Sequence, residues 1–361
     1  MTEKPIQGEK RVFMTGNEVV AWAALAANAE IMYGYPITPQ NEIMHYWTRL
    51  APKHGRKFLQ TEDEISAGFT TVGGVLAGRR SFTATAGPGN TLMQEALSMA
   101  EMMRIPIVQV VTQRGGPSTA TVIYSQQEVT MTCFGGNGEG ARIVYSTSTH
   151  QELYDYTIKA FNTAWKYRFP THVLGDGYQS KMRESLTMYD PEARGIDMVP
   201  TEPYVGNEGT PGVDRDPNHL RNTYNTEDEL YDVVTNLMSD WEKYAPEIAE
   251  YQEYDVEDAD VLIIAHGVVT RAAQAAINEL RAQGKKVGHF RPVTLRPIAE
   301  EQLRKRVEQA KSVLVVESAY GQLRKILDNA LYGLTTPITN FFKPGEGVTA
   351  DEVVEEVNKL L

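Results

Sequence analysis

Apolar runs and amphipathic stretches alternate along the first half of the chain. The runs that predict strands lie near Glu30 and at residues 57–60, 81–85, 105–112 and 171–174. Between them, helix-like patterns begin near Asn17, Gln40, Asp63 and Asn90 and cover residues 151–167. This alternation is typical of a mainly parallel sheet covered by helices on both faces.

A second alternation starts at residue 261, after a stretch of different composition. Its strands are predicted at residues 261–265, 287–290 and 312–316 and near Pro337, and its helices begin at Thr270, Ala299 and Gly321. Residues 190–260 are rich in Pro, Gly and acidic side chains and contain one amphipathic helix pattern, at 227–243. We therefore predict an α/β protein in three parts: a doubly wound domain at 1–190, an extended linker with one helix at 191–257, and a smaller α/β domain at 258–361.

Composition and charge narrow the class of protein. A chain of 361 residues that is 42% hydrophobic and 23% charged is typical of a soluble globular protein with two domains. A net charge of -12 argues against nucleic acid or an anionic membrane as the main partner. No apolar run reaches the length of a bilayer span, and residues 1–5 lack the apolar core of a signal peptide. These features predict a cytoplasmic protein.

The single cysteine, Cys133, restricts the redox chemistry of this chain. An iron–sulfur cluster uses about four thiolates, so the electrons of any redox reaction must leave through another polypeptide. We interpret Cys133 as a small apolar packing residue. The seven histidines show no metal-binding spacing, and no metal is assigned to this chain.

Four loops that follow predicted strands carry unusual side chains. They cover residues 35–39, 61–64, 86–91 and 113–119, and they contain the hydroxyl of Thr38, the carboxylate of Glu64, a Gly-Pro-Gly turn and the guanidinium of Arg114. Prolines 36 and 39 stiffen the first of these loops. Ligands of open α/β sheets bind at the carboxyl ends of the strands, so the four loops predict one assembled pocket.

Together these motifs resemble the α subunit of 2-oxoacid:ferredoxin oxidoreductases, thiamine-diphosphate enzymes that oxidatively decarboxylate 2-oxo acids to acyl-CoA. The resemblance rests on residues 35–39, 62–64, 87–93, 116–119 and 134–139, and in the second domain on residues 291–295 and 317–323. It implies a thiamine-diphosphate-binding, pyrimidine-type doubly wound domain followed by a transketolase C-terminal-like α/β domain.

The resemblance also implies roles for individual residues. Glu64 would hydrogen-bond N1′ of the aminopyrimidine, and Thr38 and Arg114 would contact the carbonyl and carboxylate of the substrate, for which a planar guanidinium is well suited. These three are the predicted catalytic residues. Further contacts are implied with the cofactor for Pro36, Ile37, Gly87, Pro88 and Gly89, and with the substrate for Ser118 and Thr119.

Each assignment has an alternative that needs no ligand. Thr61 and Glu64 have the spacing of a capping box, in which the glutamate bonds back to the helix start. Arg114 also suits an interface ion pair, the Gly-Pro-Gly segment also suits a tight turn, and the hydroxyls of Ser118 and Thr119 also suit the cap of a local turn.

Two segments qualify the resemblance. Gly175-Asp176-Gly177 looks like the magnesium motif of thiamine enzymes, but a charged, helix-breaking sequence follows it. We interpret it as a structural strand end and expect a β subunit to supply the Mg²⁺ and diphosphate half of the site. Residues 120–125 depart from the family pattern, and Ile123 and Tyr124 suit either an apolar pocket for a branched or aryl oxo acid or a contact with a neighbouring subunit.

We therefore predict the α subunit of a 2-oxoacid:ferredoxin oxidoreductase. The implied partners are β, γ and ferredoxin-like δ subunits with 4Fe–4S clusters, an external ferredoxin, coenzyme A as co-substrate and a 2-oxo acid. 2-Oxoglutarate, branched-chain and aryl oxo acids and pyruvate all remain open as that acid. The alternatives are a subunit of a non-oxidative 2-oxo acid decarboxylase and a non-catalytic interaction subunit.

Overall fold

Seven strands form the larger sheet, in the order β12-β6-β7-β5-β4-β2-β3. The computed structural model describes residues 5–207, 209–211, 213–216 and 218–361. All neighbours in this sheet pair in parallel except β12 and β6, which are antiparallel. The strands are β2 (Ile31–Gly34), β3 (Lys57–Gln60), β4 (Ser81–Thr85), β5 (Val108–Gln113), β6 (Ile143–Ser146), β7 (Thr171–Asp176) and β12 (Thr294–Arg296).

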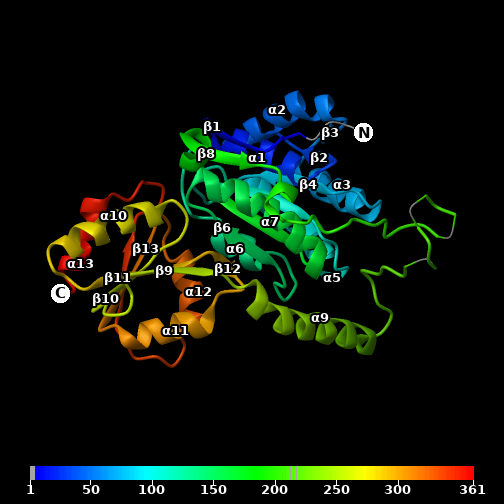
Figure 1. Cartoon of the computed structure of the whole chain (residues 1–361). Coiled ribbons are helices and arrows are strands. Elements are labelled where there is room, and N and C mark those ends of the chain that lie inside the picture. The colour runs from blue at the N-terminus through cyan, green and yellow to red at the C-terminus, as the bar shows by residue number, and fades with distance from the viewer. Residues whose placement is uncertain (1–4, 208, 212, 217) are drawn as a thin grey trace.

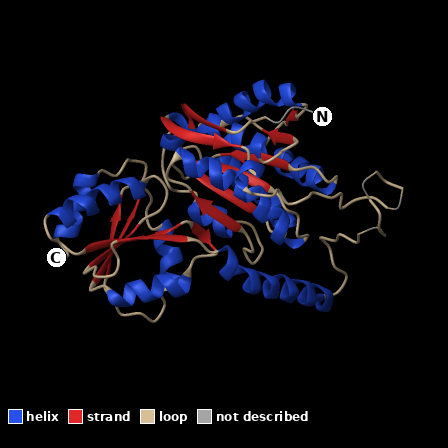
Figure 2. Cartoon of the chain, viewed as in Figure 1, coloured by secondary structure: helices blue, strands red, loops and turns tan. Residues whose placement is uncertain are grey.

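Helices cover both faces of this sheet (Figures 1 and 2). One face packs against α1, α2 and α7 in a core that includes Trp47, Phe82 and Phe161. The other face packs against α3, α5 and α6. The helices of this unit are α1 (Gly16–Ala26), α2 (Asn41–Leu50), α3 (Glu64–Leu76), α4 (Pro88–Leu92), α5 (Gln94–Met102), α6 (Val129–Phe134), α7 (His150–Tyr167) and α8 (Gly177–Lys181), with 3-10 turns at Ala51–His54 and Glu192–Arg194.

A separate antiparallel pair joins β1 (Glu9–Thr15) to β8 (Arg183–Tyr189). The sequence did not predict either strand. Met14 is the one residue of β1 that is buried, so the apolar pattern of that strand is weak. The pair depends on contacts between segments far apart in the chain.

The smaller sheet has five strands, in the order β14-β13-β10-β11-β9, and only β9 is antiparallel to its neighbour. Separate apolar clusters lie against its helices. The strands are β9 (Tyr251–Tyr254), β10 (Val261–Ile264), β11 (Val287–Pro292), β13 (Ser312–Glu317) and β14 (Ile338–Phe342), and the helices are α10 (Val269–Ala282), α11 (Glu300–Gln309), α12 (Gln322–Ala330) and α13 (Ala350–Asn358).

The two units exchange chain segments. Helix α9 (Glu227–Ile248) runs along the larger unit (Figure 1). Its Trp241 packs edge-on against Phe169, with ring centroids 5.3 Å apart. Strand β9 lies in the predicted linker but belongs to the smaller sheet, and β12 follows residue 258 but belongs to the larger sheet. The domain boundaries at residues 190 and 258 stay a prediction. Strands β9 and β12 each join a sheet on the other side of the boundary at residue 258.

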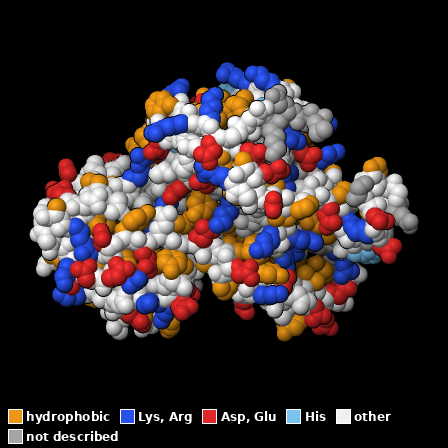
Figure 3. All heavy atoms as spheres, in the orientation of Figure 1, with side chains coloured by type: hydrophobic (Ala, Val, Ile, Leu, Met, Phe, Trp, Pro, Cys, Tyr) orange, Lys and Arg blue, Asp and Glu red, His pale blue; other side chains and the backbone are white. Residues whose placement is uncertain are grey.

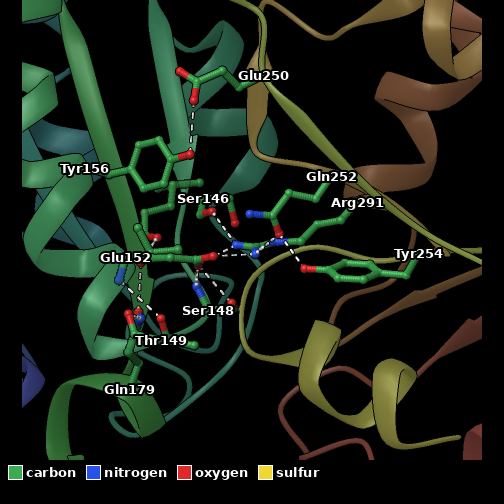
Figure 4. Close-up of polar contacts among 12 residues, drawn as sticks. Ser146, Ser148, Thr149, Glu152, Tyr156, Gln179, Glu250, Gln252, Tyr254 and Arg291 are labelled. Carbon is green, nitrogen blue, oxygen red and sulfur yellow. Dashed lines mark hydrogen bonds and ion pairs between the residues drawn. The ribbon is translucent and has the colours of Figure 1, made fainter. Parts of the chain in front are cut away.

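A buried ion pair joins the two units (Figure 4). Arg291, at the end of β11, is 1% exposed and donates hydrogen bonds of 2.6 Å to both carboxylate oxygens of Glu152 on α7. Gln252 also accepts from this guanidinium at 2.8 Å, and the backbone N–H of Ser148 donates to Glu152. The motif at residues 291–295 therefore contributes to docking of the two units, since a planar guanidinium pairs well with a carboxylate.

The surface carries both signs of charge across the face drawn in Figure 3. Within the described part of the chain, every helix is too short or too polar to cross a bilayer.

Candidate cofactor and substrate site

The sheet order brings the four predicted loops to one edge of the larger unit. Strands β5, β4, β2 and β3 are consecutive neighbours and run in parallel, so their carboxyl ends lie at the same edge. The loops at 35–39, 61–64, 86–91 and 113–119 follow β2, β3, β4 and β5, respectively. This is the edge at which open α/β sheets bind ligands.

The loop at residues 35–39 is anchored from beneath by two buried amides. Gln40 donates a hydrogen bond of 2.8 Å to the carbonyl oxygen of Tyr35, and Asn17 donates one of 2.8 Å to that of Pro39. The side chain of Thr38 is exposed above these anchors, as is Pro36, and Ile37 is half-buried. The loop therefore presents the Thr38 hydroxyl from a fixed backbone.

Glu64 is the first residue of α3 and is 5% exposed. The capping box considered as the alternative for Thr61 and Glu64 is wrong, because Asp63 is the N-cap and accepts a 2.7 Å hydrogen bond from the N–H of Ser66. The hydroxyl of Thr61 instead donates to the carbonyl oxygen of Asp63. Burial raises the pKa of the Glu64 carboxyl, and the negative charge of Asp63 adds to this effect, whereas the Glu64 backbone N–H and Arg114 oppose it.

The Gly-Pro-Gly turn leaves room for both charged groups of the site. A Cβ atom on Gly89 would lie 2.6 Å from Oε1 of Glu64, and one on Gly87 would lie 2.4 Å from Nε of Arg114. Gly87 also has a φ of +55°, which disfavours any residue with a side chain. The tight turn and the site are therefore the same feature, and Pro88, the middle residue of the turn, is the first residue of α4.

Arg114 follows β5 and is 4% exposed. Its Nη1 donates a hydrogen bond of 2.7 Å to the carbonyl oxygen of Thr38, and within the described residues nothing accepts from its buried Nε. Burial lowers the pKa of this guanidinium, and the nearby carboxylates of Glu128 and Glu64 oppose that shift. A buried guanidinium with an unused donor beside the Gly87 turn fits ligand binding better than an interface ion pair.

Ser118 and Thr119 lie in the exposed part of the loop that continues from Arg114. Their contacts with a substrate stay a prediction.

The ring of Tyr124 packs inside this chain and leaves no exposed face for a neighbouring subunit, whereas its place beside an apolar substrate pocket stays a prediction. Its ring is 2% exposed and stacks on Tyr178 inside this chain, with centroids 4.1 Å apart. The physical reason is a close backbone approach, because a Cβ on Gly177 would lie 1.1 Å from the carbonyl oxygen of Ile123. The Ile123 side chain is 59% exposed.

Glu128 is the site residue that sequence reasoning missed. It is 6% exposed, and its carboxylate accepts hydrogen bonds from the backbone N–H groups of Gly87, at 2.7 Å, and Arg114, at 2.9 Å. Burial raises the pKa of this carboxyl to about 7, although both hydrogen bonds favour the ionised form. The sequence Ser-Gln-Gln-Glu at residues 125–128 matches no motif that would have identified it.

Asp176 and Cys133 have structural rather than catalytic roles, in a helix cap and in an apolar cluster. Asp176 ends β7 and caps α8 by accepting from the N–H of Gln179 at 3.0 Å, and burial raises its pKa to about 6. This agrees with the interpretation of Gly175-Asp176-Gly177 as a strand end. Cys133 is fully buried in an apolar cluster, where burial raises the pKa of its thiol to about 12. A thiol with so high a pKa is a packing residue rather than a nucleophile.

The edge fits the aminopyrimidine half of thiamine diphosphate. The raised pKa of Glu64 favours the protonated carboxyl, which can share a proton with a ring nitrogen. The glycine at position 89 leaves space beside that carboxyl, and the buried hydroxyl of Thr85 has no partner among the described residues. Fold and site therefore define an α/β protein of the thiamine-diphosphate-binding class.

Comparison with known families identifies the family within the thiamine-diphosphate-binding class to which the chain belongs. Residues 22–253 match the family model described as pyruvate flavodoxin/ferredoxin oxidoreductase, thiamine diphosphate-binding. Residues 259–353 match the model described as pyruvate:ferredoxin oxidoreductase core domain II. The chain belongs to the 2-oxoacid:ferredoxin oxidoreductase family that these models represent.

Curated relatives match over most of their length. The 2-oxoglutarate synthase subunit KorA of Methanothermobacter thermautotrophicus is 34% identical over 333 residues, which cover 86% of this chain and 88% of the relative. The ketoisovalerate oxidoreductase subunit VorB of Methanothermobacter marburgensis is 34% identical over 313 residues, which cover 86% of this chain and 87% of that relative.

Two solved structures share the architecture. The 2-oxoglutarate:ferredoxin oxidoreductase from Magnetococcus marinus, solved with 2-oxoglutarate, coenzyme A and succinyl-CoA bound, has a TM-score of 0.86 and 27% identity, and the match covers 97% of this chain and 65% of that chain. A split-gene transketolase, with a TM-score of 0.60 and 15% identity, covers 96% of this chain and 97% of its own and shows the fold alone. The α/β fold and the family resemblance predicted from the motifs are confirmed.

Proposed function

We propose that this chain is the α subunit of a complex that oxidatively decarboxylates a 2-oxo acid to acyl-CoA and carbon dioxide and passes electrons to ferredoxin. The observation that carries the proposal is the convergence of Glu64, the Gly87 turn and Arg114 at one edge of a parallel sheet. The names of the relatives, 2-oxoglutarate synthase and ketoisovalerate oxidoreductase subunits, support a 2-oxo acid as substrate. The coenzyme A and succinyl-CoA bound to the structural neighbour support coenzyme A as co-substrate.

Glu64 holds a proton at N1′ of the aminopyrimidine in this proposal. Bound thiamine diphosphate supplies the electron sink for decarboxylation, and the protein supplies position and electrostatics. The buried surroundings of Glu64 suit this role, because they favour a carboxyl that carries a proton. In this proposal Pro36, Ile37 and the turn at residues 87–89 contact the cofactor, and Gly89 of that turn lies against the Glu64 carboxyl.

Arg114 binds the substrate carboxylate. The hydroxyl of Thr38 donates a hydrogen bond that stabilises the negative charge developing on the keto oxygen. Both groups are held in one place, because Arg114 donates to the backbone of the Thr38 loop. Ser118 and Thr119, on the exposed continuation of the Arg114 loop, add hydrogen bonds to the substrate.

The other half of the reaction lies in partner subunits. A β subunit supplies the Mg²⁺ and diphosphate site, and γ and ferredoxin-like δ subunits complete the complex. Electrons pass through 4Fe–4S clusters in these partners to an external ferredoxin, because the one cysteine of this chain is buried and cannot hold a cluster. We place the complex in the cytoplasm.

Replacing Gly89 by Ala is expected to weaken thiamine diphosphate binding. The new Cβ would lie 2.2 Å from Oγ1 of Thr85 and 2.6 Å from the Glu64 carboxyl, so one of them must move. Overpacking of this kind costs about 1–3 kcal/mol, which corresponds to roughly 5- to 150-fold in affinity. Titration of the assembled complex with thiamine diphosphate measures the change.

Gly73→Ala is the matched control. A Cβ at that helical position meets nothing within 4 Å, so binding is expected to stay at the wild-type value. Equal affinities for G89A and the wild type would contradict the placement of the cofactor beside this turn.

Native purification of the complex distinguishes the proposal from the decarboxylase alternative. We expect a brown complex whose visible absorption bleaches on reduction, because 4Fe–4S clusters absorb in that range, and whose partners include a cysteine-rich polypeptide. A colourless pair of thiamine-type chains that releases carbon dioxide from an oxo acid would favour the non-oxidative decarboxylase instead.

A further inference from the structure

We infer that Glu128 is the positioning residue that fixes Arg114 toward the substrate, and that the smaller unit in turn holds Glu128 in place. The inference rests on the proposed function of Arg114. Each carboxylate oxygen of Glu128 accepts a hydrogen bond from a different site loop. Oε1 accepts from the N–H of Gly87 at 2.7 Å, and Oε2 accepts from the N–H of Arg114 at 2.9 Å. It thereby sets the distance between the glycine turn and the arginine.

The bridge requires two acceptors. A carboxylate offers an acceptor oxygen to each backbone N–H, whereas an amide side chain would direct an NH₂ group against one of them. Glu128 is also tied at its own backbone, where the hydroxyl of Thr132 donates to its carbonyl oxygen at 2.7 Å. Because only 6% of the Glu128 surface is exposed, water does not readily replace a lost hydrogen bond of its carboxylate.

The segment before Glu128 is hydrogen-bonded to Ser318 of the smaller unit. The hydroxyl of Ser125 donates to the carbonyl oxygen of Ser318 at 2.8 Å. Gln126 bonds the same residue twice, because its N–H donates to the Ser318 carbonyl at 2.8 Å and its Oε1 accepts from the Ser318 N–H at 2.9 Å.

Gln322, the first residue of α12, extends this attachment past Glu128. Its Nε2 donates to the carbonyl oxygen of Gln127 at 2.6 Å, and its Oε1 accepts from the N–H of Thr130 at 3.0 Å. The carboxylate of Glu317 accepts from the N–H of Gln322 at 2.9 Å and fixes the start of the helix. The motif at residues 317–323 therefore acts through Glu128 on the arginine of the larger unit.

Steady-state kinetics of the assembled complex tests the role of Glu128. E128Q keeps the shape and loses one acceptor, so we expect the KM for the oxo acid to rise about 10-fold. The kcat and the affinity for thiamine diphosphate should each change by a smaller factor than this KM, because the Gly87 turn loses a hydrogen bond at most while Glu64 is not displaced. Q322M removes the Gln322 part of the attachment to the smaller unit and leaves the Ser125 and Gln126 bonds in place, so it should raise the same KM by a smaller factor. An unchanged KM in Q322M would overturn the part of Gln322 in that link.

E101Q is the matched control for a purely structural effect. Glu101 is 2% exposed and also accepts from a backbone N–H, that of Ala141, but it pairs with Arg142 rather than with Arg114. We expect E101Q to lower the melting temperature without raising the KM for the oxo acid. A lowered melting temperature with a wild-type KM in E128Q would reduce Glu128 to the same structural role and overturn the inference.

Hydrogen exchange of the substrate-free complex separates this inference from the proposed function. The amides of Gly87 and Arg114 should exchange faster in E128Q than in the wild type, and E101Q should leave them unchanged. Unchanged exchange in E128Q would overturn the bridge even in an active enzyme. Faster exchange in a complex that oxidises no oxo acid would keep the bridge and reject the proposed function.

Discussion

Glu64→Gln is expected to lower the kcat of the assembled complex by about 10²- to 10⁴-fold, the range in which a positioned acid or base contributes to catalysis. Gln keeps the shape of the side chain but cannot exchange a proton with N1′. The carboxyl is buried beside the Gly89 cradle, so no water can replace it without rearrangement. Rates of oxo-acid-dependent viologen reduction at saturating substrate measure the loss.

Two controls accompany this result: the thermal stability of E64Q and the turnover of the neighbouring variant E62Q. Because burial raises the pKa of Glu64, its carboxyl supports folding at low pH, and that contribution is lost as the pH rises through the folded-state pKa. E64Q does not titrate, so at pH 8 it should melt no lower than the wild type. Glu62, two residues earlier, is exposed, and E62Q should retain wild-type turnover. A wild-type kcat in E64Q would remove the central residue of the proposed site.

Arg114→Met should cost roughly 2–5 kcal/mol of transition-state binding, about 30- to 4,000-fold in kcat/KM, because the buried carboxylate of the substrate would lose its charged partner. The effect should fall mainly on the KM for the oxo acid. Thiamine diphosphate binding should change little, since Glu64 and the glycine turn remain in place. Initial rates over a range of oxo acid concentrations, with a separate cofactor titration, distinguish the two.

Two further variants calibrate that measurement. R114K keeps the charge but loses the planar fork, so it should recover only part of the loss. R79M removes a side chain that is 62% exposed in a surface ion pair with Glu30, and it should leave the kinetics unchanged. An unaltered response of R114M to oxo acid concentration would reject the carboxylate role of Arg114.

Strong local patterns account for the parts of the fold that the sequence predicted. Strands β3 and β4 begin and end where the apolar runs do, and the alternation with helices predicted parallel pairing. The loops of the site were visible because proline, glycine and charged residues follow those strands directly. Such residues constrain the backbone wherever they occur, so they are informative without knowledge of distant contacts.

The missed features depend on contacts between distant segments. Glu128 belongs to the site only because β5, the glycine turn and the 125–130 segment meet in space, and no local pattern encodes that meeting. The packing of Tyr124 within the chain was not predicted, because its partner, Tyr178, comes from the distant segment after β7. Strands β9 and β12 are short, and each pairs across the predicted division of the chain.

Anaerobic viologen reduction by the natively purified complex tests the central claim most directly. The assay contains coenzyme A and, in turn, 2-oxoglutarate, pyruvate, a branched-chain oxo acid and an aryl oxo acid. The proposed function predicts reduction that requires one of these acids together with coenzyme A, with thiamine diphosphate present in the purified complex. A complex that contains no thiamine diphosphate and reduces viologen with none of the acids would contradict it and favour a non-catalytic interaction subunit.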